Sequence, residues 1–202
     1  ENNFVFETLP LDSFNLNSKY SLIDWAFNKN IYGVKKDEYT FILNPVFNIQ
    51  TGSDNYFCTR RGGYARGSIG SKFKWVTSFY ENYQNFDPRI SEIVKKTAVA
   101  PGEAEVKNPF GYLDYSVSSG GFIYDFSKFF NIIAGHGKNF IGNGYRSLLL
   151  SDASGNYPFL KSNLKIGKVN YSFILSEFID FTNNMASDGL KRKKYGSFHY
   201  LD

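Results

Sequence analysis

The chain has 202 residues, enough to bury a core within one domain. A single cysteine forms no internal disulfide, and two histidines far apart in the sequence do not favour zinc, so we expect no metal and no cofactor. The net charge of +4 favours no nucleic-acid partner, and no apolar run approaches the ~18 residues that a membrane helix needs.

Aromatic residues are unusually abundant, with 21 Phe, 15 Tyr and 2 Trp beside 18 Gly. Phe and Tyr favour strands, and Gly favours turns. The composition therefore predicts an all-β protein.

Residues 1–38 show no regular period, and we assign them to an N-terminal segment of uncertain structure. Ser21 there could cap a short helix over residues 22–27. From Tyr39 the period changes to two, and the residues of one parity are apolar: Tyr39, Phe41, Leu43, Pro45, Phe47 and Ile49. Pro45 donates no ladder hydrogen bond, which predicts a bulge or a sheet edge at that position.

A hairpin is predicted next, from strands over residues 63–70 and 73–83 that turn near Gly70. The residues before it, with Asp54, Arg60 and Arg61, are interpreted as a polar loop.

One helix is predicted near residues 87–97. Asp87 is a good N-cap, and Pro88 suits the first helical position. The apolar spacing of Ile90, Ile93 and Val94 then gives an amphipathic helix. It must pack in a barrel lumen or on a loop platform.

Further strands are predicted over residues 114–126, 129–136, 159–168 and 169–181. Both a soluble sandwich and an outer-membrane barrel show such alternation, because each strand has one apolar and one polar face. Strand length, the aromatic content, and Lys and Asn on the polar parity favour the barrel. The pattern alone leaves both the soluble sandwich and the outer-membrane barrel open.

The stretch GHGKNFIGNGYRSLLLSD, at residues 135–152, resembles a phosphate loop at first sight. Gly137 and Gly142 have the required separation, but Asn143 stands where the phosphate-binding lysine belongs. Phe140 likewise replaces the third glycine of a dinucleotide fingerprint. The glycines therefore indicate a backbone role rather than a nucleotide site.

The same stretch, followed by NYPFL, resembles the signature of the Wzi-like capsule-assembly proteins of Bacteroidota, which include the RemB-type gliding-motility relatives. Shorter segments that support this resemblance follow in order along the chain: NPVFNIQ at 44–50, RGSIG at 66–70, PGE at 101–103 and KKYGSFHYL at 193–201.

This resemblance implies an antiparallel transmembrane β-barrel of the outer-membrane type, in a Gram-negative bacterium. Residues 39–202 would form its strands, with the helical insertion near 87–97, as the N-terminal part of a longer barrel. The implied function is a non-catalytic surface protein, not an enzyme, that binds or organises capsular polysaccharide or exopolysaccharide. The alternative is an accessory subunit of a protein-secretion or gliding-motility complex. The expected partners are outer-membrane lipid, anionic polysaccharide, or other outer-membrane proteins.

In this setting, polar residues of the glycine-rich stretch would crowd a lumen or its mouth. They are His136, Lys138, Asn139, Asn143, Tyr145, Arg146 and Asp152. They form either a polysaccharide site or a buried polar network in which Arg146 pairs with Asp152, and we favour the network because inward charges need partners. His199 is interpreted as a hydrogen-bonding residue of the lumen.

Overall fold

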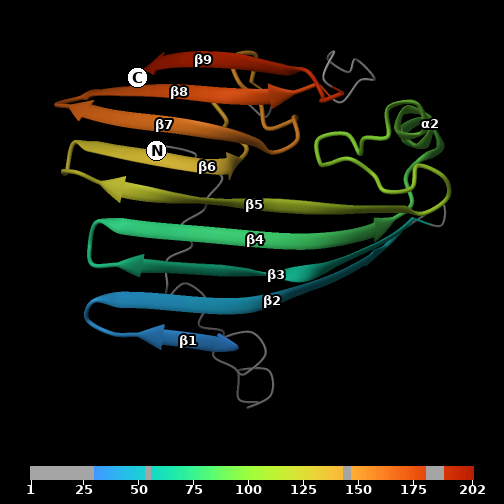
Figure 1. The fold of residues 1–202 in the computed structure, drawn as a ribbon, viewed down its shortest axis with the longest axis horizontal. Helices are drawn as coiled ribbons and strands as arrows, with labels where there is room; N and C mark the ends of the chain where they lie inside the picture. The colour runs from blue at the N-terminus through green and yellow to red at the C-terminus, as the bar shows by residue number, and fades with distance from the viewer. Residues whose placement is uncertain (1–29, 53–55, 143–146, 181–188) are drawn as a thin grey trace.

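A computed structural model describes residues 30–52, 56–142, 147–180 and 189–202 of the chain. In it, nine strands form one antiparallel sheet, and each strand pairs with the next along the sequence (Figure 1). The strands are β1 Tyr32–Lys35, β2 Tyr39–Thr51, β3 Phe57–Ile69, β4 Phe73–Gln84, β5 Leu113–Asp125, β6 Phe130–Gly137, β7 Tyr157–Ile166, β8 Val169–Ile179 and β9 Lys193–Leu201. The predicted all-β antiparallel fold is confirmed. The sheet is open, with β1 and β9 at its two edges.

The connections between strands differ at the two ends of the sheet (Figure 1). At one end lie short turns, at residues 36–38, 70–72, 126–129 and 167–168. At the other end lie the longer connections, at residues 52–56, 85–112, 138–156 and 180–192. Gly70 and Gly167 have φ of 57° and 61°, a left-handed conformation that suits glycine in a tight turn. The turn predicted near Gly70 is confirmed.

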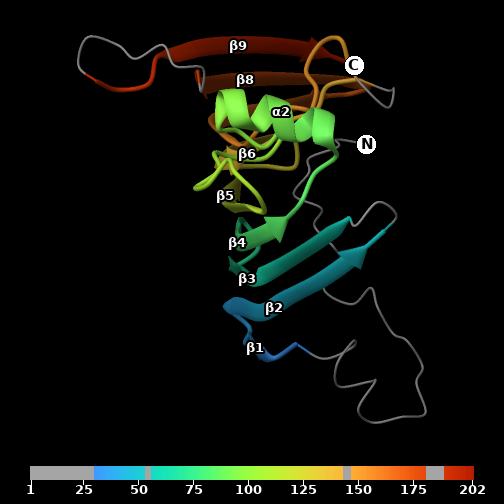
Figure 2. The same cartoon turned by 90° about the vertical axis from the view of Figure 1, so that its right-hand side faces the viewer.

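The strands are long for a globular sheet, since β2, β3 and β5 have 13 residues each. Figure 2, turned by 90° from Figure 1, shows them as a single layer that twists between β2 and β9. The predicted strand over residues 169–181 is observed as β8 up to Ile179, and Phe181 lies outside the described residues.

The predicted polar loop around Arg60 and Arg61 is wrong, because both residues belong to β3. Each has a polar partner directly opposite on β4: Arg60 faces Asn82, and Arg61 faces Glu81. Cross-strand pairing therefore accommodates charges that resemble loop residues in the sequence.

The sheet begins before Tyr39, since β1 pairs with residues 40–43 of β2. Pro45 lies just beyond this pairing, where no described strand covers β2 on that side. The predicted edge at Pro45 is therefore confirmed, and no bulge interrupts its ladder with β3. The helix predicted over residues 22–27 lies outside the described residues.

The predicted helix is observed as α2, Pro88–Thr97. Asp87 caps it by accepting a hydrogen bond from the Arg89 backbone N–H at 2.9 Å. It lies at the end of the sheet with the longer connections (Figures 1 and 2). Its buried Val94 belongs to a cluster with Ala100, Val106, Leu113 and Tyr115.

A second cluster anchors the connection between β6 and β7. It consists of Ile133, Ile141, Tyr157, Phe159 and Ile174. The described residues 147–150 form no strand; instead, Leu150 forms a single bridge with Ile141. The register places the strand residues of both clusters on the same face of the sheet.

Candidate functional site

The register divides the sheet into two faces of different chemistry. Residues directly opposite each other on neighbouring strands point to the same side. One row across β2 to β8 contains Phe41, Gly67, Trp75, Phe122, Ala134, Leu160 and Leu175. We call the side that carries this row the apolar face. We call the other side the polar face: it carries Arg60 and Asn82, together with the strand residues of both buried clusters.

A band without Asp, Glu, Lys or Arg crosses the apolar face over all nine strands. It comprises the residues of that face within 32–34, 39–49, 63–69, 73–79, 116–124, 130–136, 158–166, 169–175 and 195–201. Several of its large side chains are exposed: Phe79 by 50%, Ile69 by 60% and Ile166 by 67%. An uncharged surface of this extent, whose larger side chains are mostly apolar, is typical of a surface that meets another apolar phase or partner.

Charged residues border this band on both sides. On the side of the longer connections, Arg61 pairs with Glu81 at 3.1 Å, and Lys193 pairs with Glu177 at 2.8 Å. Lys107 bridges Glu81 and Asp114, at 3.9 and 3.6 Å. On the opposite side, the short turns carry Lys36, Asp37, Glu38, Lys72, Lys128 and Lys168.

Aromatic rings concentrate near both borders. Close to the short turns, Phe73 stacks on Phe122 with ring centroids 5.8 Å apart, and Tyr124 contacts Phe126 at 4.7 Å. Near the longer connections, Tyr83 stacks on Tyr112 at 5.0 Å. Aromatic side chains at the edges of an apolar band are typical of membrane interfaces.

The polar face carries hydrogen bonds between side chains of neighbouring strands. The Nε of Arg60 donates to Oδ1 of Asn82 at 2.7 Å, and its guanidinium lies 5.7 Å from the centroid of the Tyr80 ring. Gln84 donates to the hydroxyl of Tyr115 at 2.9 Å. Ser172, Asn163 and Asn131 form a further chain, with bonds of 2.7 and 2.9 Å.

The structure does not bring together those predicted site residues that it describes. His136 is exposed on the apolar face, where its Nδ1 lies 3.2 Å from the Ser118 carbonyl oxygen. Asn139 is buried under the polar face, and its backbone N–H donates to the Tyr157 hydroxyl at 3.0 Å. The sheet therefore separates these two residues, because the strand that carries His136 ends at Gly137 and the chain then passes under the opposite face.

The remaining predicted residues have other positions. Lys138 donates to the Gly102 carbonyl at 2.6 Å and so ties this segment to the connection that follows α2. Asp152 is exposed, 3.5 Å from the Ser151 hydroxyl. Asn143, Tyr145 and Arg146 lie outside the described residues, and so does the predicted pair of Arg146 with Asp152.

His199 lies on the apolar face, against the ring of Phe173 at 4.7 Å, and hydrogen-bonds the Tyr171 hydroxyl at 2.6 Å. It is therefore not among the polar-face residues that would line a lumen.

Sequence reasoning missed a column of small residues on β3. Gly63, Ala65 and Gly67 all point to the apolar face, between larger side chains of β2 and β4. The period-two spacing of small residues in GGYARG was the signal for this column.

Among the described residues, no group of three or more His, Cys, Asp or Glu is arranged to hold a metal ion. No helix in the described ranges is both long enough and apolar enough to cross a membrane. Comparison of the chain with known protein families, curated proteins and solved structures gives no match.

Proposed function

We propose that this chain forms part of the wall of an outer-membrane β-barrel of the Wzi-like family, with its apolar face toward lipid and its polar face toward the interior. The charge-free band carries this proposal. From Phe73 to the charged border at Glu81, β4 spans about 27 Å at ~3.4 Å per residue. A strand tilt of about 40° reduces this to about 21 Å, close to the ~25 Å apolar band of such barrels.

The difference between the two ends of the sheet also supports an outer-membrane barrel. Outer-membrane barrels have short turns on the periplasmic side and long loops on the extracellular side. The longer connections, with α2, would then face the cell exterior.

The proposed function of this wall is non-catalytic: it binds or organises capsular polysaccharide or exopolysaccharide at the cell surface. Arg60, Tyr80 and Asn82 lie together on the polar face. A guanidinium suits the carboxylate of an acidic sugar, an amide suits its hydroxyls, and a tyrosine ring offers a stacking surface. This cluster is a better candidate site than the residues of the glycine-rich stretch, because its members share one face.

Membrane fractionation and a binding assay test the two parts of the proposal. The protein is expected in the outer-membrane fraction, and folded protein in detergent should co-sediment with anionic capsular polysaccharide. Arg60→Met should lose this binding, whereas Arg61→Met, on the opposite face, should retain it. Heat-modifiable migration on a gel confirms that both variants are folded.

Recovery in the soluble fraction would contradict the membrane wall. Membrane localisation without polysaccharide binding would contradict only the proposed polysaccharide ligand and would leave the membrane wall intact. In that case, a stable protein partner on affinity purification would favour the accessory subunit of a secretion or gliding complex.

A further inference from the structure

A groove runs along β3 on the apolar face. Its floor is the column Gly67, Ala65 and Gly63, which contributes no side chain larger than a methyl group. Its walls are the residues of the neighbouring strands directly opposite the floor: Phe41, Leu43 and Pro45 of β2, and Trp75, Thr77 and Phe79 of β4. The floor covers about 14 Å, from Gly67 to Gly63, at ~3.4 Å per residue.

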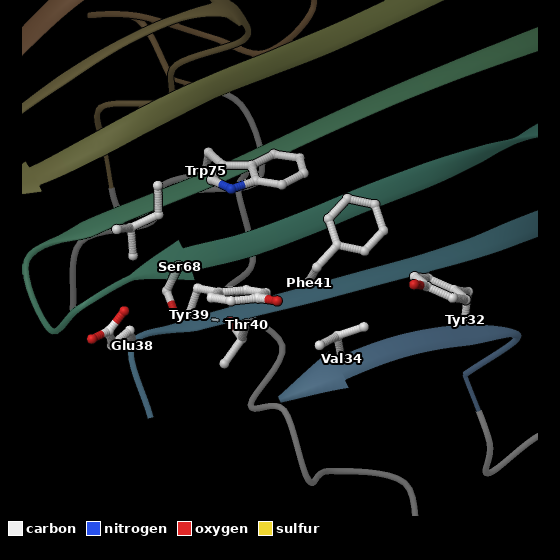
Figure 3. A pocket seen from close by; sticks show the side chains of 9 residues that line it. Tyr32, Val34, Glu38, Tyr39, Thr40, Phe41, Ser68 and Trp75 are labelled. Atoms are coloured by element: carbon white, nitrogen blue, oxygen red, sulfur yellow. Dashed lines mark hydrogen bonds between the residues drawn. The ribbon is translucent and has the colours of Figure 1, made fainter. Parts of the chain in front are cut away.

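The groove opens at the short turns into a depression of about 540 Å³ (Figure 3). Tyr32, Tyr39, Phe41 and Trp75 provide its aromatic lining, with Glu38 at its rim. The rings of Phe41 and Trp75 approach to 5.8 Å above β3. A Cβ on Gly67 would lie 2.9 Å from the indole nitrogen of Trp75, so glycine at this position lets the indole lie against the strand.

Some polar atoms of the depression are available to a ligand, whereas the hydroxyls of Thr40 and Ser68, which also line it, hydrogen-bond each other at 2.8 Å. Within the described part of the chain, the hydroxyls of Tyr32 and Tyr39 and the indole N–H of Trp75 make no hydrogen bond, and Glu38 makes no ion pair. The Lys36 ammonium lies 5.6 Å from the centroid of the Tyr39 ring, beside the same rim. Hydrogen-bond donors and both signs of charge therefore meet at the mouth of an apolar groove.

The other end of the groove is closed by charge. Arg61 follows Gly63 on the same face, and its guanidinium is paired with Glu81 at 3.1 Å. The groove thus has a polar mouth, an apolar floor and a polar stop. Its apolar floor of about 14 Å leads from the mouth through the middle of the charge-free band, so an acyl chain can lie along it.

We propose that this groove holds a single phospholipid with a zwitterionic headgroup, such as phosphatidylethanolamine; this inference rests on the proposed membrane wall. One acyl chain lies along Gly67, Ala65 and Gly63. The phosphate accepts hydrogen bonds from Tyr39 and Trp75 and is attracted by Lys36, while Glu38 attracts the ammonium group.

A sugar fits the groove less well, because its hydroxyls need partners along their whole length. The floor has no polar side chain, and β3 pairs with strands on both sides, so its backbone groups are already used in the ladders. A lipid chain requires no such partners.

Trp75 provides a local probe, because the chain has only two tryptophans, Trp25 and Trp75. The Trp25→Phe protein is reconstituted into vesicles of phosphatidylethanolamine and phosphatidylglycerol, with brominated acyl chains on one lipid or the other. We expect brominated phosphatidylethanolamine to quench Trp75 several-fold more strongly than brominated phosphatidylglycerol.

Two variants should reduce this difference. Ala65→Leu fills the groove and should bring quenching by the two lipids to the same level, whereas Ala134→Leu, a matched change on the apolar face of β6, should leave it unchanged. Glu38→Gln, at the exposed turn, should reduce the preference for phosphatidylethanolamine without affecting insertion. It gives a result even if Ala65→Leu does not fold.

Equal quenching by both lipids, unchanged by Ala65→Leu and Glu38→Gln, would overturn the lipid site but leave the membrane wall intact. Absence of quenching by either lipid would mean that Trp75 does not meet hydrocarbon, and the membrane wall would fail as well. If Trp75 emission responds instead to anionic polysaccharide without vesicles, the groove is a sugar site and the lipid proposal is wrong.

Discussion

Replacement of Thr77 by lysine tests whether the apolar face meets lipid or water. Thr77 is an exposed residue of the apolar face on β4, midway between Phe73 and the charged border at Glu81. Near a bilayer midplane, lysine on the lipid face of a barrel costs about 2–4 kcal/mol. On a surface in water, the same exposed change costs within about 0.5 kcal/mol. A loss of about 3 kcal/mol lowers the folding equilibrium constant by roughly two orders of magnitude.

The assay is urea unfolding of protein reconstituted in vesicles, followed by heat-modifiable gel migration. Thr59→Lys is the matched control, because Thr59 lies on the same face of β3 but beyond the border at Arg61. It should cost only about 0–1 kcal/mol, as at a membrane interface. Equal and small effects of Thr77→Lys and Thr59→Lys would refute a hydrocarbon environment for the band.

Three further substitutions test the internal contacts. Gly121→Ala should destabilise the sheet by about 1–3 kcal/mol, since its Cβ would lie 2.7 Å from the Ala134 carbonyl oxygen; an unchanged urea midpoint would contradict this close approach of β5 and β6. Val94→Ala, at a fully buried position, should lower the free energy of unfolding by about 2 kcal/mol and speed proteolysis within α2. An unaltered digestion rate would show that the packing of Val94 does not hold the helix in place. Tyr115→Phe leaves the buried Gln84 amide without its hydrogen-bond partner and should lower the free energy of unfolding by about 1–3 kcal/mol in the same assay. A neutral result would exclude that hydrogen bond.

The sequence predicted those parts of the fold that depend on local pattern. The alternation from Tyr39 gave β2 with its face assignment, and Asp87 marked the start of α2. Pro45 marked the position where β2 has no described outer neighbour, because a residue without an N–H is tolerated only where the ladder does not need it.

Features that depend on register could not be predicted in the same way. Arg61 resembles a loop residue until β4 is aligned and Glu81 appears opposite to it. His136 and Asn139 are close in sequence, but a strand end between them places them on opposite faces. A polar cluster in the sequence is therefore not a site unless the backbone keeps its members on one side.

The strand count constrains how the proposed wall is completed. Since nine antiparallel strands alternate in direction, the edge strands β1 and β9 run the same way, and direct pairing between them would be parallel. Bacterial outer-membrane barrels are antiparallel with an even strand number, and each backbone group left unpaired in hydrocarbon costs several kcal/mol. Within the band and among the described residues, β9 pairs only with β8, and β2 has no neighbour beyond its pairing with the short β1. In a bilayer, the two edges therefore require an odd number of additional strands between them. A single strand antiparallel to both would satisfy the count.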